Sequence, residues 1–376
     1  MELGLLPALG GGIAELARTG QASRLVDGYL GRYARAFERV WYASYLVETL
    51  ADYTQDPRVL GAVRVLAPRR AQPRLARALA IARVHRAELN RCAVFRVFQV
   101  TGVIPAIAAR RRWGTPFVTS YGFWYARLSR PGPSRLAKRA LERLGLRLAA
   151  AVIAPTPELC AHAATMAPGD RVHLIPNGVD LARFRPAGER RARPEGRILY
   201  VGRLSEEKNL GALVRAAELL RPRVESRLVL IGAGPLRARL EADARAAGVA
   251  AEFPGVVDHG RLPEWLAGAD VFALPSFTEG HPKALIEAMA AGLPCVASDC
   301  AGNRALVKDG ETGLLFDPRD PAAMADCLAR ALGDRDLAAD LGRRAREAVA
   351  RDYDLGRLVD AEIALLKRVA RDERGV

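Results

Sequence analysis

The segment VFALPSFTEGHPKALIEAMAAGLPCVA, residues 271–297, contains the pattern that decides the fold. Its two ends, 271–274 and 295–297, are apolar runs of the length of a buried strand, and residues 283–291 between them have the apolar spacing of a helix. A strand, a helix and a second strand in this order predict a parallel βαβ unit. The helix begins near Pro282, directly after a loop that carries the carboxylate of Glu279.

The same alternation extends along the whole chain. In the first half, apolar runs predict strands at 3–9, 39–46, 63–67, 94–99, 117–120 and 150–154. A Pro-Asn-Gly turn at 176–178 ends a further short strand and marks a domain boundary. In the second half we predict strands at 198–201, 227–231 and 251–253, and helices at 209–220, at 235–247, from 263, and at 321–332, 336–351 and 355–371. The sequence therefore predicts two doubly wound α/β domains with parallel sheets, at 1–176 and 177–350, followed by a C-terminal helix at 351–376.

Length and composition are those of a soluble globular protein. The chain has 376 residues, half of them hydrophobic, which suits about two domains. Its amino terminus lacks the features of a secretory signal and no apolar run is long enough to cross a bilayer, so we expect a cytoplasmic protein. The five cysteines are scattered and form no metal-binding motif, which indicates buried thiols: Cys92, Cys160, Cys295, Cys300 and Cys327.

Positive charge is concentrated in the first half. Residues 1–176 contain 26 Lys and Arg against 11 Asp and Glu, whereas 177–376 contain 31 of each. Because the second half is equally rich in arginine and yet balanced, composition alone explains the asymmetry poorly. Basic residues recur at near-helical spacing over 69–86, and those of 127–147 alternate with leucines. Three interpretations stay open: a basic amphipathic helix on anionic lipid, contact with an anionic acceptor glycan, and a solvated surface.

Two polar loops follow strands of the second half, at the edge where a doubly wound sheet binds ligands. The first, GRLSEEKN at 202–209, carries Arg203 and Lys208 near a helix start, a pair of cations that suits a diphosphate. The second, GAGP, contains Gly232 and Gly234, which lack side chains and let a ligand approach the backbone. Tight packing of a turn explains these glycines equally well.

The third loop precedes the helix at 283–291. Glu279 can accept hydrogen bonds from sugar hydroxyls, while Lys283 and the backbone amides of Lys283, Ala284 and Leu285 can face phosphate oxygens. Glu287 lies one turn beyond Lys283 on the same helical face, within reach of a ribose diol. The alternative is an ordinary Lys283–Glu287 helix pair with a solvated Glu279. That alternative explains one loop, but not three matched loops of one sheet.

The second half of the chain resembles the donor domain of the retaining glycosyltransferases of family 4. The resemblance lies in the motifs just described, in the IPNGVD turn at 175–180 and in the two glutamates within EGHPKALIEAMAAGLPCVAS. The similarity covers residues 172–351, and the first domain matches in layout only. The resemblance implies the GT-B fold, in which two Rossmann-like domains face a central cleft and the C-terminal helix crosses back to the first domain.

The resemblance also implies roles for individual residues. Arg203 and Lys208 correspond to the pair that neutralises the nucleotide diphosphate, Glu279 to the carboxylate that contacts the donor sugar, and Glu287 to the one that binds ribose; the first three are the expected catalytic residues. The expected donor-binding residues are Gly202, Gly232, Gly234, His281, Lys283, Ala284, Leu285 and Glu287, and the loop of Gly10, Gly11 and Gly12 is expected beside the diphosphate and the acceptor.

One position departs from the family pattern. Many members carry a histidine after a strand of the first domain that touches the donor sugar, and here the strand 117–120 is followed by Tyr121. A phenol can hydrogen-bond a hydroxyl, but its pKa near 10 makes it a poor general base at neutral pH. A packed aromatic side chain is the alternative. Since the family is metal-independent, we expect no metal and no cofactor, only a UDP- or GDP-linked sugar as donor substrate.

The sequence therefore predicts a retaining hexosyltransferase that acts on a glycan or lipid-linked acceptor, in the synthesis of cell-envelope polysaccharide or glycolipid. The expected partners are the nucleotide sugar, the acceptor, and an anionic membrane surface bound by the basic first domain, which would place the protein on the cytoplasmic face of the membrane. Two alternatives are a sugar-nucleotide epimerase on the same fold and a non-catalytic basic protein that binds nucleic acid or other anions. We expect no nucleic acid, because the chain has no recognition motif for it.

Overall fold

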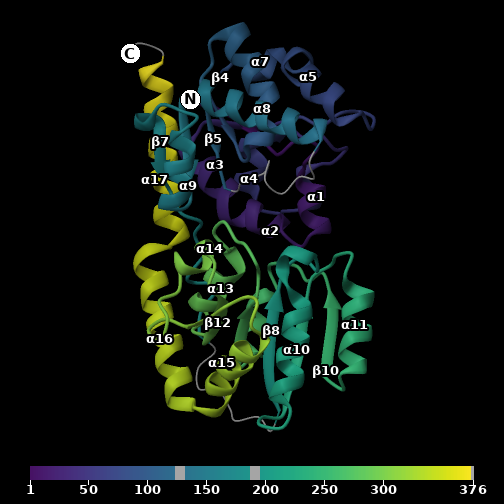
Figure 1. Ribbon diagram of the computed structural model, residues 1–376. Coiled ribbons are helices and arrows are strands. Elements are labelled where there is room, and N and C mark those ends of the chain that lie inside the picture. Colours follow the sequence, from purple (N-terminus) through teal and green to yellow (C-terminus); the bar gives the residue numbers. More distant parts are fainter. Residues whose placement is uncertain (123–131, 187–194, 374–376) are drawn as a thin grey trace. The chain divides into compact units, whose positions relative to one another are not determined.

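The structure, a computed structural model, describes residues 1–122, 132–186 and 195–373 (Figure 1). The predicted basic residues Arg127 and Arg130 and the last three residues of the predicted C-terminal segment lie outside these ranges. The chain forms two compact units: one consists of Met1–Pro176 and Arg357–Val376, and the other of Asn177–Gly356. Each unit is built around its own sheet.

The first unit contains a seven-stranded sheet in the order β3-β2-β1-β4-β5-β6-β7, with parallel pairing throughout. Its strands are β1 (Glu2–Leu6), β2 (Arg39–Tyr42), β3 (Val63–Val65), β4 (Cys92–Val97), β5 (Phe117–Ser120), β6 (Ala151–Ala154) and β7 (Val172–Leu174). Its helices are α1 (Ile13–Arg18), α2 (Ala22–Leu25), α3 (Gly31–Ala36), α4 (Pro57–Ala62), α5 (Arg74–Val84), α6 (Arg86–Leu89), α7 (Val103–Trp113), α8 (Pro133–Leu148), α9 (Pro157–Ala164) and most of α17 (Leu355–Asp372).

The second unit repeats this strand order with six strands, β10-β9-β8-β11-β12-β13, again all parallel. Its strands are β8 (Gly196–Val201), β9 (Ser226–Ile231), β10 (Ala250–Gly255), β11 (Val271–Leu274), β12 (Cys295–Ser298) and β13 (Leu314–Phe316). Its helices are α10 (Leu210–Leu220), α11 (Arg237–Ala246), α12 (Leu262–Ala267), α13 (Lys283–Ala290), α14 (Ala301–Arg304), α15 (Pro321–Gly333) and α16 (Arg335–Asp352). In both units the order reverses beside the first strand, as in a doubly wound sheet.

The central strands are buried along their whole length because helices cover both faces of such a sheet. All residues of β11 and β12 are buried, and so are all residues of β4, including the charged Arg96. The α/β fold class with two doubly wound parallel sheets, predicted from the alternation of strands and helices, is confirmed.

Some boundaries differ from the prediction for local reasons. The strand predicted at 3–9 ends at Leu6, because Pro7 has no N–H to donate to the ladder. Strand β13 and helix α14 were not predicted, since three and four residues are too short to show a periodic pattern.

Helix α17 is attached to the first unit by a buried ion pair. Nε and Nη2 of Arg96 donate to Oε1 and Oε2 of Glu362 at 2.7 and 3.0 Å, which makes the pair bidentate. The hydroxyl of Tyr33 donates to the same carboxylate, and Nη2 of Arg96 also donates to Oγ of Ser120 at 2.8 Å. Burial by itself would lower the pKa of Arg96, but the charge of Glu362, its hydrogen bond and the nearby tyrosines together outweigh burial and raise the pKa above its usual range. A residue near the end of the chain is thus bonded to the central part of the first sheet.

Two further properties bear on the predictions. Cys92, Cys295 and Cys300 are buried as predicted, whereas Cys160 and Cys327 are half-buried. In the part of the chain that the structure describes, no helix is both long enough and apolar enough to span a bilayer.

Candidate functional site

The three predicted loops meet at the carboxyl edge of the six-stranded sheet. They follow β8, β9 and β11, and β8 lies between the other two strands, so the loops are neighbours. Backbone hydrogen bonds join them directly: Leu204 N donates to Ala233 O at 3.0 Å, and Phe277 N donates to Glu207 O at 3.0 Å. This is the edge at which open parallel sheets bind ligands.

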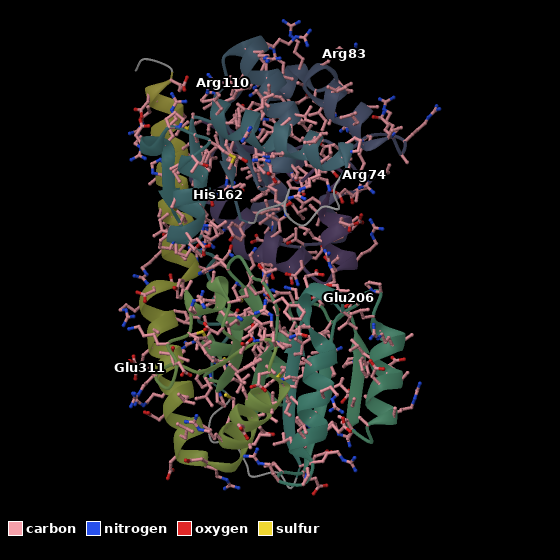
Figure 2. All side chains as sticks on the ribbon, in the orientation of Figure 1. Arg74, Arg83, Arg110, His162, Glu206 and Glu311 are labelled. Atoms are coloured by element: carbon pink, nitrogen blue, oxygen red, sulfur yellow. The ribbon has the colours of Figure 1, made fainter. Side chains whose placement is uncertain are left out.

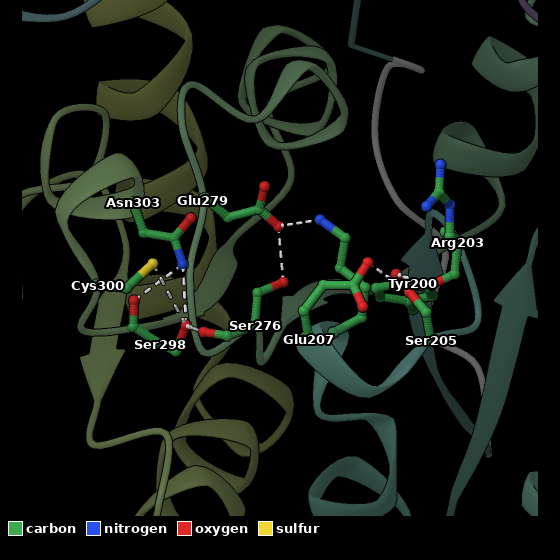
Figure 3. A network of polar contacts seen from close by, with 10 residues as sticks. Tyr200, Arg203, Ser205, Glu207, Ser276, Glu279, Ser298, Cys300 and Asn303 are labelled. Atoms are coloured by element: carbon green, nitrogen blue, oxygen red, sulfur yellow. Dashed lines mark hydrogen bonds and ion pairs between the residues drawn. The ribbon is translucent and has the colours of Figure 1, made fainter. Parts of the chain in front are cut away.

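An ion pair between Lys208 and Glu279 lies at the centre of this edge (Figure 3). Nζ of Lys208 donates to Oε1 of Glu279 at 2.6 Å, and the side chains are 21% and 9% exposed. The two residues are 71 positions apart in the sequence, and adjacent strands bring them together. Because both groups are largely removed from water, their attraction is stronger than that of a surface pair.

A chain of polar contacts holds Glu279 in place. Ser276 Oγ donates to the same Oε1 at 2.7 Å, and Ser298 Oγ donates to Ser276 O at 2.5 Å. The amide of the fully buried Asn303 donates to both O and Oγ of Ser298, at 2.9 and 3.0 Å. Figure 3 shows these side chains linked from Asn303 through Ser298 and Ser276 to Glu279. The network fixes the carboxylate to the ends of β11 and β12.

Asn209 ties the first loop to two others. It has φ of 53°, in the left-handed region that asparagine tolerates better than most residues. Its Nδ2 donates to the carbonyl oxygens of Pro275 and Pro318, at 3.1 and 2.7 Å. The sequence motif contains Asn209, but no role was predicted for it, because its two acceptors are backbone atoms far along the chain.

The predicted glycines have a packing role in this edge. A Cβ on Gly232 would lie 1.9 Å from Gly202 O, one on Gly234 would lie 2.1 Å from Leu204 O, and one on Gly202 would collide with the hydroxyl of Tyr200. Gly232 also has φ of +136°, which disfavours any side chain. The glycines therefore let the two loops pack on each other, which is the alternative weighed for the GAGP motif.

Arg203 and Glu207 lie on the first loop. The hydroxyl of Tyr200 donates to Arg203 O at 2.8 Å, and Figure 3 shows the Arg203 side chain extending away from the network. Burial raises the pKa of Glu207, but the hydrogen bond from Ser205 and the nearby charges of Lys208 and Arg203 outweigh it, so the pKa is lowered. Glu207 is thus an anion, held at 2.7 Å by Ser205.

Helix α13 points its amino terminus at this edge. Its N-cap residue, Pro282, has no side-chain hydrogen bond to offer, so no side chain at that position caps the first amides. Lys283 and Ala284 are half-buried, while Leu285 packs in the core and can offer only its backbone amide. The helix dipole makes this end attractive to an anion.

Glu287 lies one turn into α13, and it is buried rather than solvated. Its Oε1 lies 2.9 Å from Nε2 of His259, and both side chains are less than a tenth exposed. The histidine partner of Glu287 comes from the loop after β10. His259 was not predicted, because nothing in its local sequence marks it.

His281 is buried in the loop that carries Glu279. Its ring lies 5.3 Å from that of Tyr353, and its carbonyl oxygen accepts a hydrogen bond of 2.9 Å from Nδ2 of Asn177. Both neighbours belong to segments next to the points where the chain passes from one unit to the other. Burial, aided by the charge of Lys283, lowers the pKa of His281 to about 3. The imidazole is therefore neutral at physiological pH.

This shift predicts a pH dependence of stability. The unfolded state binds a proton at His281 below pH of about 6.5, whereas the folded state does not until pH of about 3. The folded state is therefore destabilised as the pH falls through this window, by about 1.4 kcal/mol per pH unit. We expect urea unfolding measured below about pH 6.5 to show this contribution to the slope of unfolding free energy against pH, and the His281→Phe variant to lack it. An identical pH slope in the variant would contradict the assignment.

In the first unit, the glycine loop adjoins a carboxylate that was not predicted. Glu48 accepts hydrogen bonds from the amides of Ile13 and Ala14, at 3.0 and 2.6 Å. A Cβ on Gly12 would lie within 3.0 Å of both Glu48 oxygens, and Gly10 has φ of +83°. Gly11 N donates to Ala8 O at 2.8 Å, which closes the turn. The glycines permit this turn and the close approach of Glu48.

Tyr121 is a packed aromatic residue in this structure. Its side chain is 1% exposed and belongs to the hydrophobic core of the first unit. Its ring stacks on that of His162, with centroids 5.8 Å apart. This placement matches the packed-side-chain alternative weighed for Tyr121.

Two family models match the chain. The model described as Glycosyltransferase Family 4 matches residues 19–183, and the model described as Glycosyl transferases group 1 matches residues 186–348. The second match contains the three loops and helix α13.

Curated relatives are similar over about half of the chain. A D-inositol 3-phosphate glycosyltransferase of Nocardia farcinica is 37% identical over 195 residues, which are 47% of this chain and 43% of that protein. A GDP-mannose-dependent alpha-(1-6)-phosphatidylinositol monomannoside mannosyltransferase of Mycobacterium tuberculosis is 33% identical over 236 residues, 58% of this chain and 61% of that protein. The chain thus spans less than two thirds of the length of these relatives.

Solved structures are similar over nearly the full chain. The sucrose-phosphate synthase of Thermosynechococcus elongatus superposes with a TM-score of 0.80 at 21% identity, covering 98% of this chain and 99% of that one. The Anabaena protein HepE in complex with UDP-glucose gives a TM-score of 0.76 at 18% identity, covering 97% and 98%. At these identities the similarity shows the fold alone.

Proposed function

This chain belongs to the family-4 glycosyltransferases of the GT-B fold, and we propose that it transfers a sugar from a nucleotide diphosphate sugar to a hydroxyl group of a glycan or lipid-linked acceptor. In this proposal the anomeric configuration is retained, no metal ion takes part, and the product belongs to a cell-envelope polysaccharide or glycolipid. The Mycobacterium relative is named for a lipid acceptor and a GDP-linked donor, and the Anabaena structure contains a UDP-linked sugar, which supports both donor classes as candidates.

The observation that carries the proposal is the Lys208–Glu279 pair beside the amino terminus of α13. A nucleotide sugar presents hydroxyls, two phosphates and a ribose diol in a row. The edge offers a fixed carboxylate, two cations with helix amides, and a second carboxylate on α13. We assign Glu279 to the donor sugar, Lys208 and Arg203 with the amides of Lys283 to Leu285 to the diphosphate, and Glu287 to the ribose.

The proposed reaction is a front-face displacement. The bond between the anomeric carbon and the phosphate oxygen breaks, the acceptor oxygen bonds to the same face of that carbon, and the departing phosphate oxygen takes the acceptor's proton. The protein then supplies no nucleophile. Its task is to stabilise the negative charge that develops on the leaving diphosphate, which preorganised cations and helix amides do well.

Thermal unfolding with a panel of nucleotide sugars tests the proposal. We expect one of UDP-glucose, UDP-galactose, UDP-N-acetylglucosamine and GDP-mannose to stabilise the protein, by about 2.7 kcal/mol when present at 100 times its Kd. EDTA should leave the effect unchanged. If no member of the panel stabilises the protein, the proposal is wrong, and if free epimerised donor forms without an acceptor, the activity is that of an epimerase.

Replacing Glu279 with glutamine should separate binding from turnover. The variant removes one negative charge near the diphosphate and releases Lys208 from its ion pair, so we expect free UDP or GDP to bind about tenfold more tightly, while sugar transfer falls. Calorimetric titration measures the first effect and steady-state kinetics the second. Glu311→Gln, a change of the same kind at an exposed position of the same unit, is the control. Weaker nucleotide binding by the Glu279 variant would contradict the assignment.

We further propose that the first unit binds an anionic membrane surface. Helices α5 and α8 both contact α7 and carry apolar side chains in water: Leu75, Leu79 and Val84 on α5, and Leu136 and Leu144 on α8. Exposed basic residues lie on the same two helices: Arg74 and Arg83, and Lys138, Arg139, Arg143 and Arg147. Figure 2 labels Arg74 and Arg83, near the two ends of α5; the side chain of Arg74 also packs over Gly10. Apolar side chains among cations suit the surface of an anionic bilayer.

The prediction of a basic face is wrong for Arg77, which is buried. Arg77 is 1% exposed, and its guanidinium donates to the carbonyl oxygens of Ser44 and Leu66, the latter at 2.9 Å. It belongs to the interior of the unit, because the apolar face of α5 packs against α7. The remaining exposed cations carry the membrane proposal.

Vesicle sedimentation tests it. We expect the protein to bind vesicles that contain phosphatidylglycerol at least about tenfold better than neutral vesicles, since each basic residue near an anionic surface contributes about 1 kcal/mol. Leu136→Asp should weaken this binding, whereas Leu219→Asp, at an exposed position of the second unit, should not. Equal binding to both kinds of vesicle would refute the membrane proposal and leave the proposed transfer reaction intact.

A further inference from the structure

His259 lies between a fixed aromatic ring and the carboxylate of Glu287. On one side its imidazole packs against Phe184, with ring centroids 5.2 Å apart, and on the other Nε2 lies 2.9 Å from Oε1 of Glu287. His259 is 6% exposed, so its ring cannot turn without displacing packed neighbours.

Phe184 is itself held by other parts of the second unit. Its amide donates to Asp180 O at 2.8 Å, and its carbonyl oxygen accepts a hydrogen bond from Nη1 of Arg346 on α16. The same Nη1 donates to Ala290 O, at the end of the helix that carries Glu287. A rigid frame therefore sets the position of the imidazole relative to α13.

The pairing has a chemical consequence for Glu287. With Glu287 ionised, its carboxylate only accepts hydrogen bonds, and Nε2 of His259 is then the donor. A glutamate has three side-chain torsions, and a donor at one oxygen selects one orientation of the carboxylate. The two oxygens offer about four lone-pair sites, so a carboxylate held in this way keeps the capacity to accept bonds from a diol.

We propose that His259 is a positioning residue that orients Glu287 toward the ribose of the donor and thereby sets the preference for ribonucleotides over 2′-deoxyribonucleotides. The inference rests on the proposed function, in which Glu287 accepts hydrogen bonds from the ribose hydroxyls. His259 itself acts only through Glu287. A ligand that lacks one hydroxyl leaves the oriented carboxylate with an unmet bond, and this lowers its affinity.

The experiment compares UDP and GDP with dUDP and dGDP by calorimetric titration. We expect the wild-type protein to prefer the ribonucleotide by about 10- to 100-fold, the range of a hydrogen bond to a charged group. His259→Phe keeps a ring against Phe184 but removes the donor, so the preference should fall to about twofold or less. His259→Gln places an amide donor at a similar reach and should restore the preference, whereas the shorter His259→Asn should not. If the phenylalanine variant does not fold, the Gln and Asn variants alone decide the result.

The outcomes separate this inference from the proposed function. Loss of discrimination in His259→Phe and His259→Asn with recovery in His259→Gln supports the inference, since a purely structural role would weaken both nucleotides equally. Discrimination that survives in all three variants but disappears in Glu287→Gln overturns the inference and leaves the ribose contact of Glu287 intact. A wild-type protein that binds ribo- and deoxyribonucleotides equally overturns the ribose contact, and the inference with it.

Discussion

The Lys208→Ala variant is expected to transfer sugar with a kcat/KM about 100- to 1000-fold below that of the wild-type protein, the loss seen when one donor to a developing anion is removed. Two effects act in the same direction. The leaving diphosphate loses a cation, and the carboxylate of Glu279, 9% exposed and held by Ser276, loses its counter-charge and repels the donor.

Steady-state kinetics with the donor found in the thermal panel measures this effect. Lys308→Ala is the matched control, because Lys308 is an exposed lysine of the same unit that lies 4.0 Å from its acidic neighbour Glu311. Thermal unfolding of each variant separates lost catalysis from lost fold. Full turnover in a folded Lys208→Ala protein would remove Lys208 from the mechanism, and full turnover in a folded Arg203→Ala protein would remove Arg203.

The second large effect concerns stability. Glu362→Ala leaves the guanidinium of Arg96 buried without its carboxylate, and removing one partner of a buried pair costs about 3–5 kcal/mol. The hydroxyl of Tyr33 loses its acceptor as well. We expect urea unfolding, followed by the fluorescence of the tryptophans, which include Trp41 and Trp113 in the first unit, to give a free energy of unfolding lower by about 3–5 kcal/mol.

The double variant Arg96→Met/Glu362→Leu provides the control for this prediction. Replacing both charges by apolar side chains of similar volume removes the unpaired charge, so most of the lost stability should return. A double variant as unstable as Glu362→Ala would show that the specific hydrogen bonds, to Ser120 among others, matter more than the charge. A change below about 1 kcal/mol in the single variant would contradict the account of how α17 is attached.

The strands with clear ends could be predicted from sequence. The strands β5 and β11 have the predicted bounds: β11 is an apolar run that stops at Pro275, and β5 is a short run of aromatic and β-branched residues that stops at Ser120. Strand β13 could not be predicted, since three apolar residues in a loop-rich stretch occur often without forming a strand. The burial of Arg77 was missed for a different reason, because a basic residue at helical spacing reads as solvated until its carbonyl partners are known.

The site could be predicted in part. The meeting of Lys208 and Glu279 follows from a general rule, because loops at the carboxyl ends of adjacent parallel strands converge. Glu48 and His259 could not be found, since their partners are 35 and 28 residues away and their own neighbours form no pattern. Contacts of this kind depend on packing between loops, and a single sequence does not encode them in any local spacing.

Retention of the anomeric configuration is tested most directly by measuring the configuration of the sugar at the moment of its release. We expect slow transfer of the sugar to water when no acceptor is present, so the measurement needs no knowledge of the acceptor. Proton NMR of an α-linked nucleotide sugar incubated with the protein distinguishes the anomers before they equilibrate. A retaining transfer releases the α-anomer first, and we expect Lys208→Ala to release it at about 1% of the wild-type rate or less. Initial appearance of the β-anomer would contradict retention.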